Sequence, residues 1–320
     1  MNPVFARVLD GEGRGREASE DECREGRSSR GVLWIHLNYS DETSATWLVE
    51  ESGLDEVTAE ALLAPDPRAR SLVVGDGLMV ILRGINVAEG ADPEDMVALR
   101  VWLEKDRVIS VRRRSIAAAQ SVLQALDRGM GPADSGDLLQ SIVDQLMDRI
   151  SVTVQQLEDD VDDLEERVLS AESRELRTKI SELRRKAIAL RRHIAPQRET
   201  LGRLHTERVT WLSDLARARL RESADRVIRH VETLDFARER AAVTYEELSN
   251  RMAEQMNHTM YRLSIVAAIF LPLGLLTGLL GINVGGIPGT QSPWAFALVS
   301  VALVLIGIGE WLYFRSSRLL

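Results

Sequence analysis

The sequence contains little that could hold a metal ion permanently or cross-link the chain. It has one cysteine, Cys23, so no disulfide bond can form within the chain, as is usual in a reducing compartment. The five histidines are scattered, and neither a Cys-x-x-Cys nor a His-x-x-x-His spacing occurs. A closed structural zinc site, which needs four cysteine or histidine ligands, is therefore excluded. We expect no bound cofactor.

An excess of positive charge is also missing. The chain has 40 basic and 49 acidic residues, and its net charge is -9. Neutralising the phosphates of a nucleic acid requires a positive surface, so we expect no nucleic-acid partner. The sequence also lacks a nucleotide-binding loop, a nucleophile motif and paired catalytic carboxylates in a recognisable context. We therefore predict that the protein is not an enzyme.

Charged side chains are absent from residues 263–309, a run of 47 residues. As a helix, residues 263–281 would be about 28 Å long, which suffices to cross a hydrocarbon core of ~30 Å. A second apolar run, residues 294–314, has aromatic residues at both ends, as is common at membrane interfaces. Residues 282–293 contain glycine, proline and asparagine, which favour a loop. We predict two membrane spans, an external loop between them, and a tail over residues 315–320.

Basic residues at the ends of this hairpin predict its orientation. Arg262 precedes the first span, Arg315 and Arg318 follow the second, and the loop has no lysine or arginine. The positive-inside rule places both termini in the cytoplasm. Charged residues interrupt any apolar core of a signal peptide at the N-terminus. We therefore expect the protein in the bacterial inner (plasma) membrane.

The residues before the spans predict an α+β cytoplasmic domain with long helices. Residues 1–30 are rich in glycine, serine and charge in their second half, so we expect a mobile segment. Residues 31–132 contain strand-like runs on both sides of Gly75-Asp76-Gly77 and of residues 104–107, which predict two hairpins. We expect a cytoplasmic α/β domain there, with a mainly antiparallel sheet.

Apolar residues then recur at spacings of three and four, which predicts long helices over residues 133–223. We expect Pro196 to kink or interrupt one of them. Residues 224–281 contain neither proline nor glycine before Pro272, so a stalk helix that continues into the first membrane span is predicted.

Residues 158–166 hold seven acidic residues out of nine. Clustered carboxylates attract divalent cations, so one interpretation is a cation-collecting or cation-sensing surface. The other interpretation is the solvated face of a helix whose buried stripe includes Val161 and Leu164. For the first interpretation the candidate residues are Asp159, Asp160, Asp162 and Asp163.

The end of the first span carries the most specific motif. Phe270-Leu271-Pro272 is followed by Gly281-Ile282-Asn283 and then by Val-Gly-Gly. A bare Gly-x-Asn occurs by chance in many proteins, but here it closes the first of two C-terminal spans. In this position it resembles the signature of the CorA family of two-span metal-ion transporters, and the longer string resembles its zinc-transporting ZntB branch. The tract Arg191-Arg192-His193-Ile194-Ala195-Pro196 also resembles the family's basic kink with a proline.

The resemblance implies a pentameric funnel in which the first span of each of five copies lines a central pore. Gly281, Ile282 and Asn283 would form its selectivity motif. Further residues at alternating spacings of three and four could face a five-fold axis. We call these residues the pore seam: Asn257, Met260, Ser264, Ala267, Leu271, Gly274 and Gly278. The alternative is ordinary packing of small residues between membrane helices.

Asn283 is the residue on which the transport hypothesis depends most. Five copies of its side-chain carbonyl would form a neutral polar ring at the outer mouth. Such a ring would bind the hydration shell of a divalent cation weakly enough for the ion to leave, as conduction requires. A helix C-cap is the alternative role for Asn283, and the two roles are compatible.

The loop after Asn283 departs from the pattern of magnesium-transporting relatives. Those relatives commonly have an aromatic residue after Gly-x-Asn and an acidic residue later in the loop. Here residues 284–289 read Val-Gly-Gly-Ile-Pro-Gly and carry no acid, which favours the zinc branch. The resemblance also implies proton coupling, for which Glu310 and His258 are the ionisable candidates near the membrane. Both side chains would equally suit an interfacial position.

We therefore predict a homopentameric transporter that moves divalent cations, zinc above all, into the cytoplasm. A magnesium or cobalt channel of the same architecture is the first alternative. An alternative of another class is a membrane-tethered helical scaffold or sensor that transports nothing. That alternative leaves the position of Gly281-Ile282-Asn283 unexplained.

Overall fold

The computed structural model describes residues 1–170, 174–204, 206–207, 209–282, 287, 289 and 291–316. The chain divides into two compact units, Met1–Tyr245 and Glu246–Leu320. The first contains a sheet and several helices, and the second contains two apolar helical segments. Each unit is described by itself.

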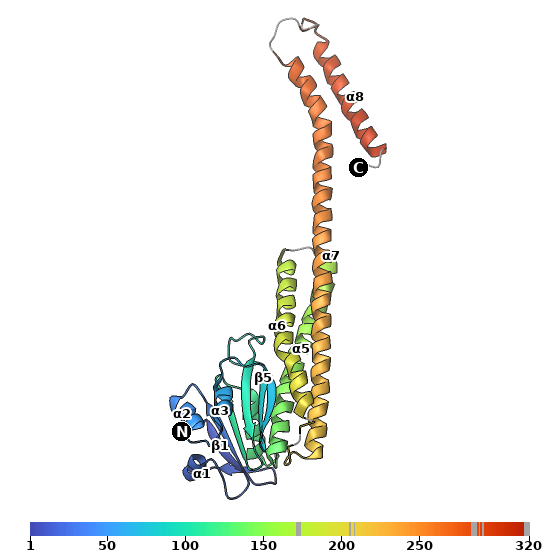
Figure 1. Ribbon diagram of the computed structural model, residues 1–320. Helices are drawn as coiled ribbons and strands as arrows, with labels where there is room; N and C mark the ends of the chain where they lie inside the picture. The colour runs from blue at the N-terminus through green and yellow to red at the C-terminus, as the bar shows by residue number, and fades with distance from the viewer. Residues whose placement is uncertain are drawn as a thin grey trace. The chain divides into compact units, whose positions relative to one another are not determined.

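The first unit is built on a seven-stranded sheet (Figure 1). Its strands lie in the order β2-β1-β3-β7-β6-β5-β4. Strands β3 and β7 pair in parallel, and the other neighbouring strands pair antiparallel. The mainly antiparallel sheet expected from the hairpin signals is confirmed. The strands are β1 (Phe5–Leu9), β2 (Gly15–Glu17), β3 (Val32–Asn38), β4 (Arg70–Val74), β5 (Gly77–Gly84), β6 (Val97–Leu103) and β7 (Arg107–Arg112).

The expectation of a mobile segment over residues 1–30 is wrong. Strand β1 pairs with β3 over its full length, and its side chains alternate into the core. Ser19 is the N-cap of helix α1 (Glu20–Glu25), and its side chain and that of Glu22 form a reciprocal capping box. These local hydrogen bonds order a polar stretch that has few apolar residues to bury.

The hairpin between β4 and β5 follows from its turn residues. Gly75 has a φ of 60°, which a glycine adopts without steric cost. A Cβ at Gly77 would lie 2.1 Å from the ring of Trp102, so the close approach of this indole also requires glycine. Because Gly77 has no side chain, the Trp102 indole of β6 fits beside the start of β5 when the two strands pair.

Helices cover both faces of the sheet. Helices α2 (Glu42–Glu50) and α3 (Glu56–Leu63) contact one face, where Trp47 and Leu62 are buried in the core. The other face contacts α5 (Ser135–Ser170) and α6 (Arg174–Leu204), and α4 (Ala117–Asp127) lies against α5. The first unit is therefore a three-layer α+β domain.

The long helices follow the apolar stripes that the sequence predicted. Helix α5 buries Val161 and Leu164, among others, and Asp134 caps its start by accepting from the backbone N–H of Asp137. Helix α6 continues through Pro196, so of the two expected effects, a kink or an interruption, the interruption does not occur; Ile194 and Leu201 on either side of the proline are fully buried. Helix α7 (Asp214–Leu280) begins ten residues before the expected stalk boundary at residue 224.

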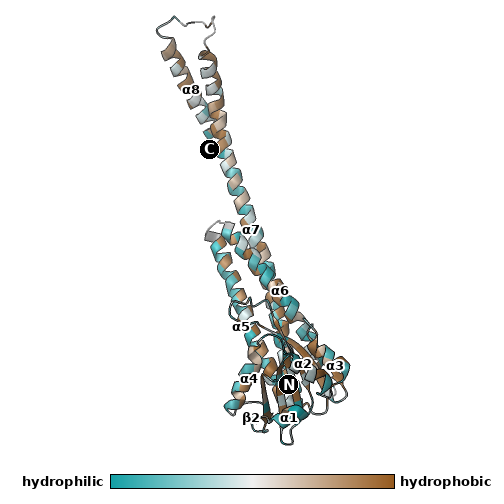
Figure 2. Ribbon diagram, turned by 90° about the vertical axis from the view of Figure 1, so that its left-hand side faces the viewer, coloured by the Kyte–Doolittle hydropathy of each residue, from teal (hydrophilic) through white to brown (hydrophobic). Residues whose placement is uncertain are grey.

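The second unit comprises the end of α7 and helix α8 (Ala295–Ser316). Along α7 the residues change from mixed to mainly apolar, and α8 is apolar over most of its length (Figure 2). Both helices are long and apolar enough to cross a membrane. The expected second span, residues 294–314, lies within one residue of α8 at its start.

Candidate ion pathway

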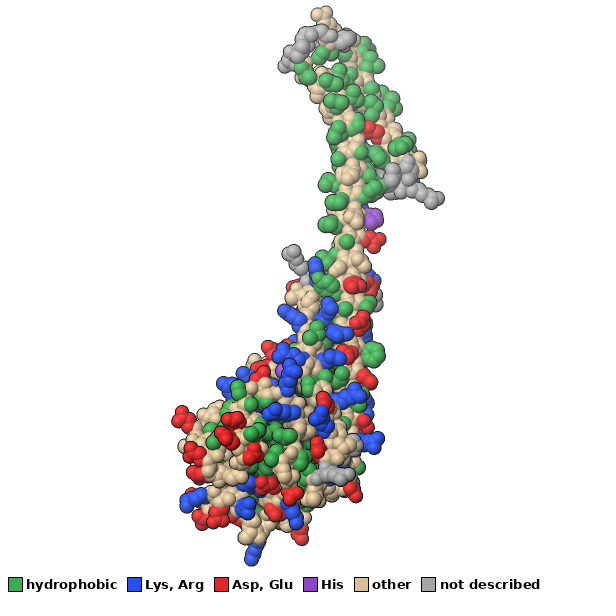
Figure 3. Space-filling view, viewed as in Figure 1, with side chains coloured by type: hydrophobic (Ala, Val, Ile, Leu, Met, Phe, Trp, Pro, Cys, Tyr) green, Lys and Arg blue, Asp and Glu red, His purple; other side chains and the backbone are tan. Residues whose placement is uncertain are grey.

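The membrane segment of α7 exposes a large apolar surface. On the face drawn in Figure 3, apolar side chains predominate at the end of α7 and on α8, whereas most of the charged side chains lie on the first unit. Leu263, Phe270 and Leu271 are among the exposed residues. A soluble monomer rarely exposes a continuous apolar surface of this kind. The surface is therefore suited to contact with lipid or with other copies of the chain.

One side of this segment faces α8. Ile265 is only 7% exposed, and Ile269, Pro272, Leu273 and Leu276 are half-buried. The Cδ1 atom of Leu273 lies 3.8 Å from the position that a Cβ of Gly307 would occupy, so glycine allows the two helices to approach. At about 100° per residue, these five positions lie within about 100° of one another on the helix and therefore share one face.

The pore seam lies on the opposite side of α7. With 3.6 residues per turn, its positions are roughly half a turn away from the face that contacts α8. All seven pore-seam residues are exposed in the single chain, and Leu271 is 71% exposed. A Cβ at Gly274 or Gly278 would meet no atom within 4 Å. The structure thus brings the pore-seam residues onto one uncovered face.

Hydroxyl groups within this segment bond to the backbone of their own helix. The Ser264 hydroxyl donates to the Met260 carbonyl at 2.9 Å. The Thr277 hydroxyl donates to the Leu273 carbonyl at 2.9 Å. Such bonds satisfy the hydroxyl proton where hydrocarbon offers no acceptor, and they leave an oxygen lone pair free on each side chain.

Helix α7 ends at the start of the Gly-Ile-Asn motif. The Gly281 N–H donates to the Thr277 carbonyl at 2.9 Å, and a Cβ at Gly281 would lie 3.1 Å from that oxygen. Glycine therefore permits a tight last turn. Ile282 is exposed after it. Asn283, the third member of the motif, lies outside the described residues.

Two ionisable side chains lie in or beside the apolar segments. Glu310 on α8 is half-buried, and its Oε2 atom is enclosed without a hydrogen-bond partner among the residues that the structure describes. His258 on α7 is exposed. At the end of α8, the Arg315 guanidinium stacks on the Trp311 ring at 5.2 Å, a pairing of residue types that is common at membrane interfaces.

The acidic run on α5 divides into paired and solvated carboxylates. Arg240 on α7 donates from Nε to Glu165 at 3.0 Å and also forms an ion pair with Asp162. Asp159 and Asp160 accept from glutamines one turn earlier on α5, and Asp163 is exposed. Within the described ranges, no three His, Cys, Asp or Glu side chains are placed to hold a metal ion.

The sequence did not predict the ion pair of Arg240. Its partner Glu165 lies 75 residues earlier on another helix, so no local spacing identifies it. Hydrogen bonds that Arg240 donates to these carboxylates raise its pKa above the ordinary value, with Glu165 the larger cause and Asp162 the smaller. Two of the seven carboxylates therefore bind α5 to α7, and they are not free to attract cations.

An α+β domain followed by two apolar C-terminal helices defines a membrane protein with a two-span C-terminus. Comparison with known proteins specifies the class further. The model of the family described as "CorA-like Mg2+ transporter protein" matches residues 29–316. The chain belongs to this family, whose members are metal-ion transporters and not enzymes.

Relatives match the chain over nearly its whole length. It is 37% identical over 315 residues to "Zinc transport protein ZntB" of Yersinia enterocolitica, covering 98% of this chain and 95% of that protein. It is 36% identical over 325 residues to "Divalent cation transporter CmaX" of Pseudomonas aeruginosa, covering 98% and 96%. A solved structure of the full-length CmaX protein has a TM-score of 0.85 and 35% identity, covering 99% of this chain and 98% of that one.

Proposed function

We propose that this protein takes up divalent metal cations, zinc above all, through a pore formed by five copies of the chain. The observation that carries the proposal is the uncovered pore seam on α7. Apart from the apolar Met260 and Leu271 its residues are small or polar, and all seven lie on the side of the helix that α8 leaves free. A helix that borders lipid all round has no need of glycine at two consecutive seam positions.

The pore seam supplies the features that a cation pathway needs. Asn257 and Ser264 offer oxygen atoms, whereas Met260 and Leu271 offer apolar constrictions that can close by excluding water. Gly274 and Gly278 leave room for a lumen toward the end of the span. Asn283 follows this face directly in sequence, and five asparagine carbonyls would surround the outer mouth.

The choice of zinc rests on two supports. The relative from Yersinia enterocolitica is called a zinc transport protein, and the loop of this chain has no acidic residue. A magnesium channel is the second candidate, because the description of the matching family model specifies Mg2+. The two candidates share the architecture and differ in the ion that passes.

The orientation follows from charge. Arg262 and Arg315 lie at the ends of the two apolar segments that would share the cytoplasmic side, so both termini would face the cytoplasm of a bacterial inner membrane. Glu310 and His258 are the candidates for a proton-linked step. A carboxylate enclosed among apolar side chains exchanges its proton readily only when a partner or water reaches it.

Zinc flux in proteoliposomes tests the proposal. Purified protein is reconstituted in vesicles that contain a zinc-sensitive dye, and Asn283→Ala is measured beside the wild type. We expect zinc entry that falls at least tenfold in the variant, because its polar ring would be lost. An inward proton gradient should accelerate entry if transport is coupled to protons.

Other results would select another function. Magnesium entry without zinc entry would assign the protein to the channel alternative. The absence of flux for every divalent ion, with the protein correctly inserted, would contradict the proposal and favour a tethered scaffold.

A further inference from the structure

A pocket of about 310 Å³ opens at one edge of the sheet in the first unit. The carboxyl ends of β3, β5 and β7 and the start of β6 meet at this edge, since β3 and β7 are parallel and β6 is antiparallel to both of its neighbours. Helix α6 forms another wall of the pocket. The basic lining residues are Arg83, Arg100, Arg113, Arg114, Arg192 and His193.

The pocket carries an excess of positive charge in an acidic chain. Two aspartates line it with these basic residues: Asp66 forms an ion pair with Arg83, and Asp95 forms one with Arg114. The remaining three arginines, Arg100, Arg113 and Arg192, have no carboxylate partner in the part of the chain that the structure describes. The pocket thus holds three uncompensated guanidinium groups in a protein whose net charge is -9.

Arg100 on β6 is the least expected of the three. It is only 2% exposed, yet its hydrogen bonds reach neutral oxygens alone, the best of them the Ala64 carbonyl at 2.8 Å. Its Nε atom has no partner among the described atoms, and its guanidinium stacks on the Tyr39 ring at 4.8 Å. Burial lowers the pKa of Arg100, and the opposing effects of Tyr39 and of the nearby Asp66 do not cancel it. A buried charge without a partner is costly, and a bound anion would offset that cost.

Helix α6 contributes charge from the other wall. Arg192 is exposed, and His193 is half-buried beside it. The pKa of His193 is lowered, first by burial and then by the charges of Arg83 and Arg192. Positive charges from the sheet and from α6 therefore converge on the same space, and the two aspartates that line it are paired with other arginines.

We propose that this pocket binds a small multiply charged anion of the phosphate class, held by Arg100 from the sheet, Arg113 after β7 and Arg192 from α6. Planar guanidinium groups pair with phosphate oxygens through two parallel hydrogen bonds each, which favours phosphate over a spherical ion. The volume of about 310 Å³ admits more than a halide and reaches the lower range of small-ligand sites. The bound anion would connect the sheet to α6. This site does not depend on the proposed transport of zinc.

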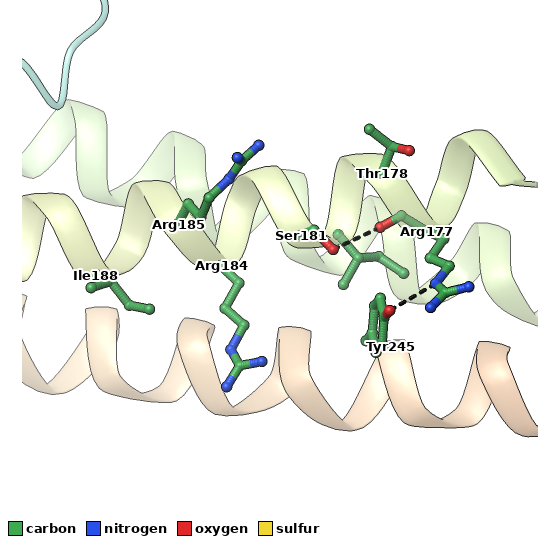
Figure 4. Close-up of a pocket in the computed structure, with 8 residues that line it drawn as sticks. Arg177, Thr178, Ser181, Arg184, Arg185, Ile188 and Tyr245 are labelled. Atoms are coloured by element: carbon green, nitrogen blue, oxygen red, sulfur yellow. Dashed lines mark hydrogen bonds between the residues drawn. The ribbon is translucent and has the colours of Figure 1, made fainter.

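A second arginine group on α6 provides a matched control. An open groove between α6 and α7 is lined by Arg177, Arg184 and Arg185 (Figure 4). Arg177 donates to the Tyr245 hydroxyl at 2.7 Å, and Arg184 and Arg185 are exposed. None of these three guanidinium groups is buried as that of Arg100 is. Substituting Arg184 and Arg185 removes the same charge from the same helix without touching the pocket.

Direct binding measurements on the full-length protein in detergent, with a metal chelator present, test the proposal. Inorganic phosphate, pyrophosphate and ADP are titrated by calorimetry against the wild type, against Arg113→Gln/Arg192→Gln and against Arg184→Gln/Arg185→Gln. We expect saturable binding that strengthens from phosphate to pyrophosphate. Affinity should fall about tenfold or more in the first double variant and stay within about twofold in the second.

Comparing the affinities for ADP and for pyrophosphate also identifies the source of the bound phosphate group. Tighter binding of ADP than of pyrophosphate would assign the site to a nucleotide, and the reverse order would assign it to a free polyphosphate. An equal loss of affinity in both double variants would overturn the proposal, because it would indicate non-specific attraction. So would binding that chloride abolishes at equal concentration, or the absence of saturable binding. Arg113 and Arg192 are exposed, so their variants are expected to fold.

Discussion

Replacing Gly278 by leucine separates a pore role of α7 from a packing role. In the single chain, a Cβ at this position meets no atom within 4 Å, so the fold does not oppose the larger side chain. Leucine is favoured over glycine in a helix by about 1 kcal/mol, so the helix should become more stable. If the pore seam lines a five-fold pore, however, five leucines would enter one cross-section and exclude water from it. We expect zinc flux to fall at least tenfold, which corresponds to a barrier higher by about 1.4 kcal/mol.

Gly309→Leu on α8 is the matched control. Gly309 is also exposed, and a Cβ added there would also meet no atom within 4 Å, but this residue does not belong to the pore seam. Flux into proteoliposomes and the oligomeric state in detergent are measured for both variants. Near-normal flux through Gly278→Leu, or equal losses in the two variants, would refute the assignment of the pore seam. Loss of the oligomer in Gly278→Leu alone would indicate a packing role.

Two further predictions concern the first unit. Arg240→Met removes the ion pairs with Glu165 and Asp162 and should lower the free energy of unfolding by about 1 kcal/mol, because these groups are partly screened by solvent. Urea titration measures this loss, which should shrink in 1 M salt, and a loss independent of salt would contradict an ionic origin. Burial, assisted by the charge of Arg112, lowers the pKa of His36 to about 3. In the unfolded chain the His36 imidazole takes up a proton near pH 6.5, whereas in the native protein it stays neutral. The free energy of unfolding should therefore fall by about 2 kcal/mol between pH 6.5 and 5. His36→Gln should reduce that slope in thermal unfolding, whereas an unchanged slope would exclude this histidine as its cause.

Much of the membrane region could be predicted because its signals are local. Residues 263–309 have no charge, and the glycine- and proline-containing loop divides them into two lengths that fit a bilayer. The spacing of the pore seam also follows from sequence alone. What spacing could not specify is which side of α7 would contact α8. Ile269 and Leu276 lie half-buried on that side. They are aliphatic residues like the exposed Leu275, so residue type does not distinguish the two sides.

The composition of the N-terminal segment predicted mobility because it does not reveal how a short strand pairs with a distant one. Strand β1 has five residues, and its order depends on pairing with β3, more than twenty residues later. A local signal for α1 was nevertheless present, since Ser19 and Glu22 have the spacing of a capping box. Pro196 misled for the opposite reason. This local helix breaker predicted a kink or an interruption, and the interruption does not occur, since buried residues on both sides of the proline hold α6 together.

The arginine pocket could not be predicted because its members are far apart in the sequence. Arg100 comes from a strand, Arg113 follows the next strand, and Arg192 comes from a helix almost eighty residues later. Arg113 belongs to the run Arg112-Arg113-Arg114 and Arg192 lies beside Arg191, but such short basic runs do not indicate that they meet Arg100 in the fold. Only the parallel pairing of β3 with β7 and the contact of α6 with β5 bring these charges to one edge.

The accessibility of α7 to a charged thiol reagent during transport would decide whether the pore seam borders the ion pathway. The single native cysteine is removed by Cys23→Ser, and Leu271→Cys on the pore seam is compared with Leu273→Cys on the side that faces α8. We expect a membrane-impermeant reagent to stop zinc flux through Leu271→Cys and to leave flux through Leu273→Cys unchanged. Block of Leu273→Cys alone, or equal block of both, would contradict the claim that this face of α7 lines the ion pathway.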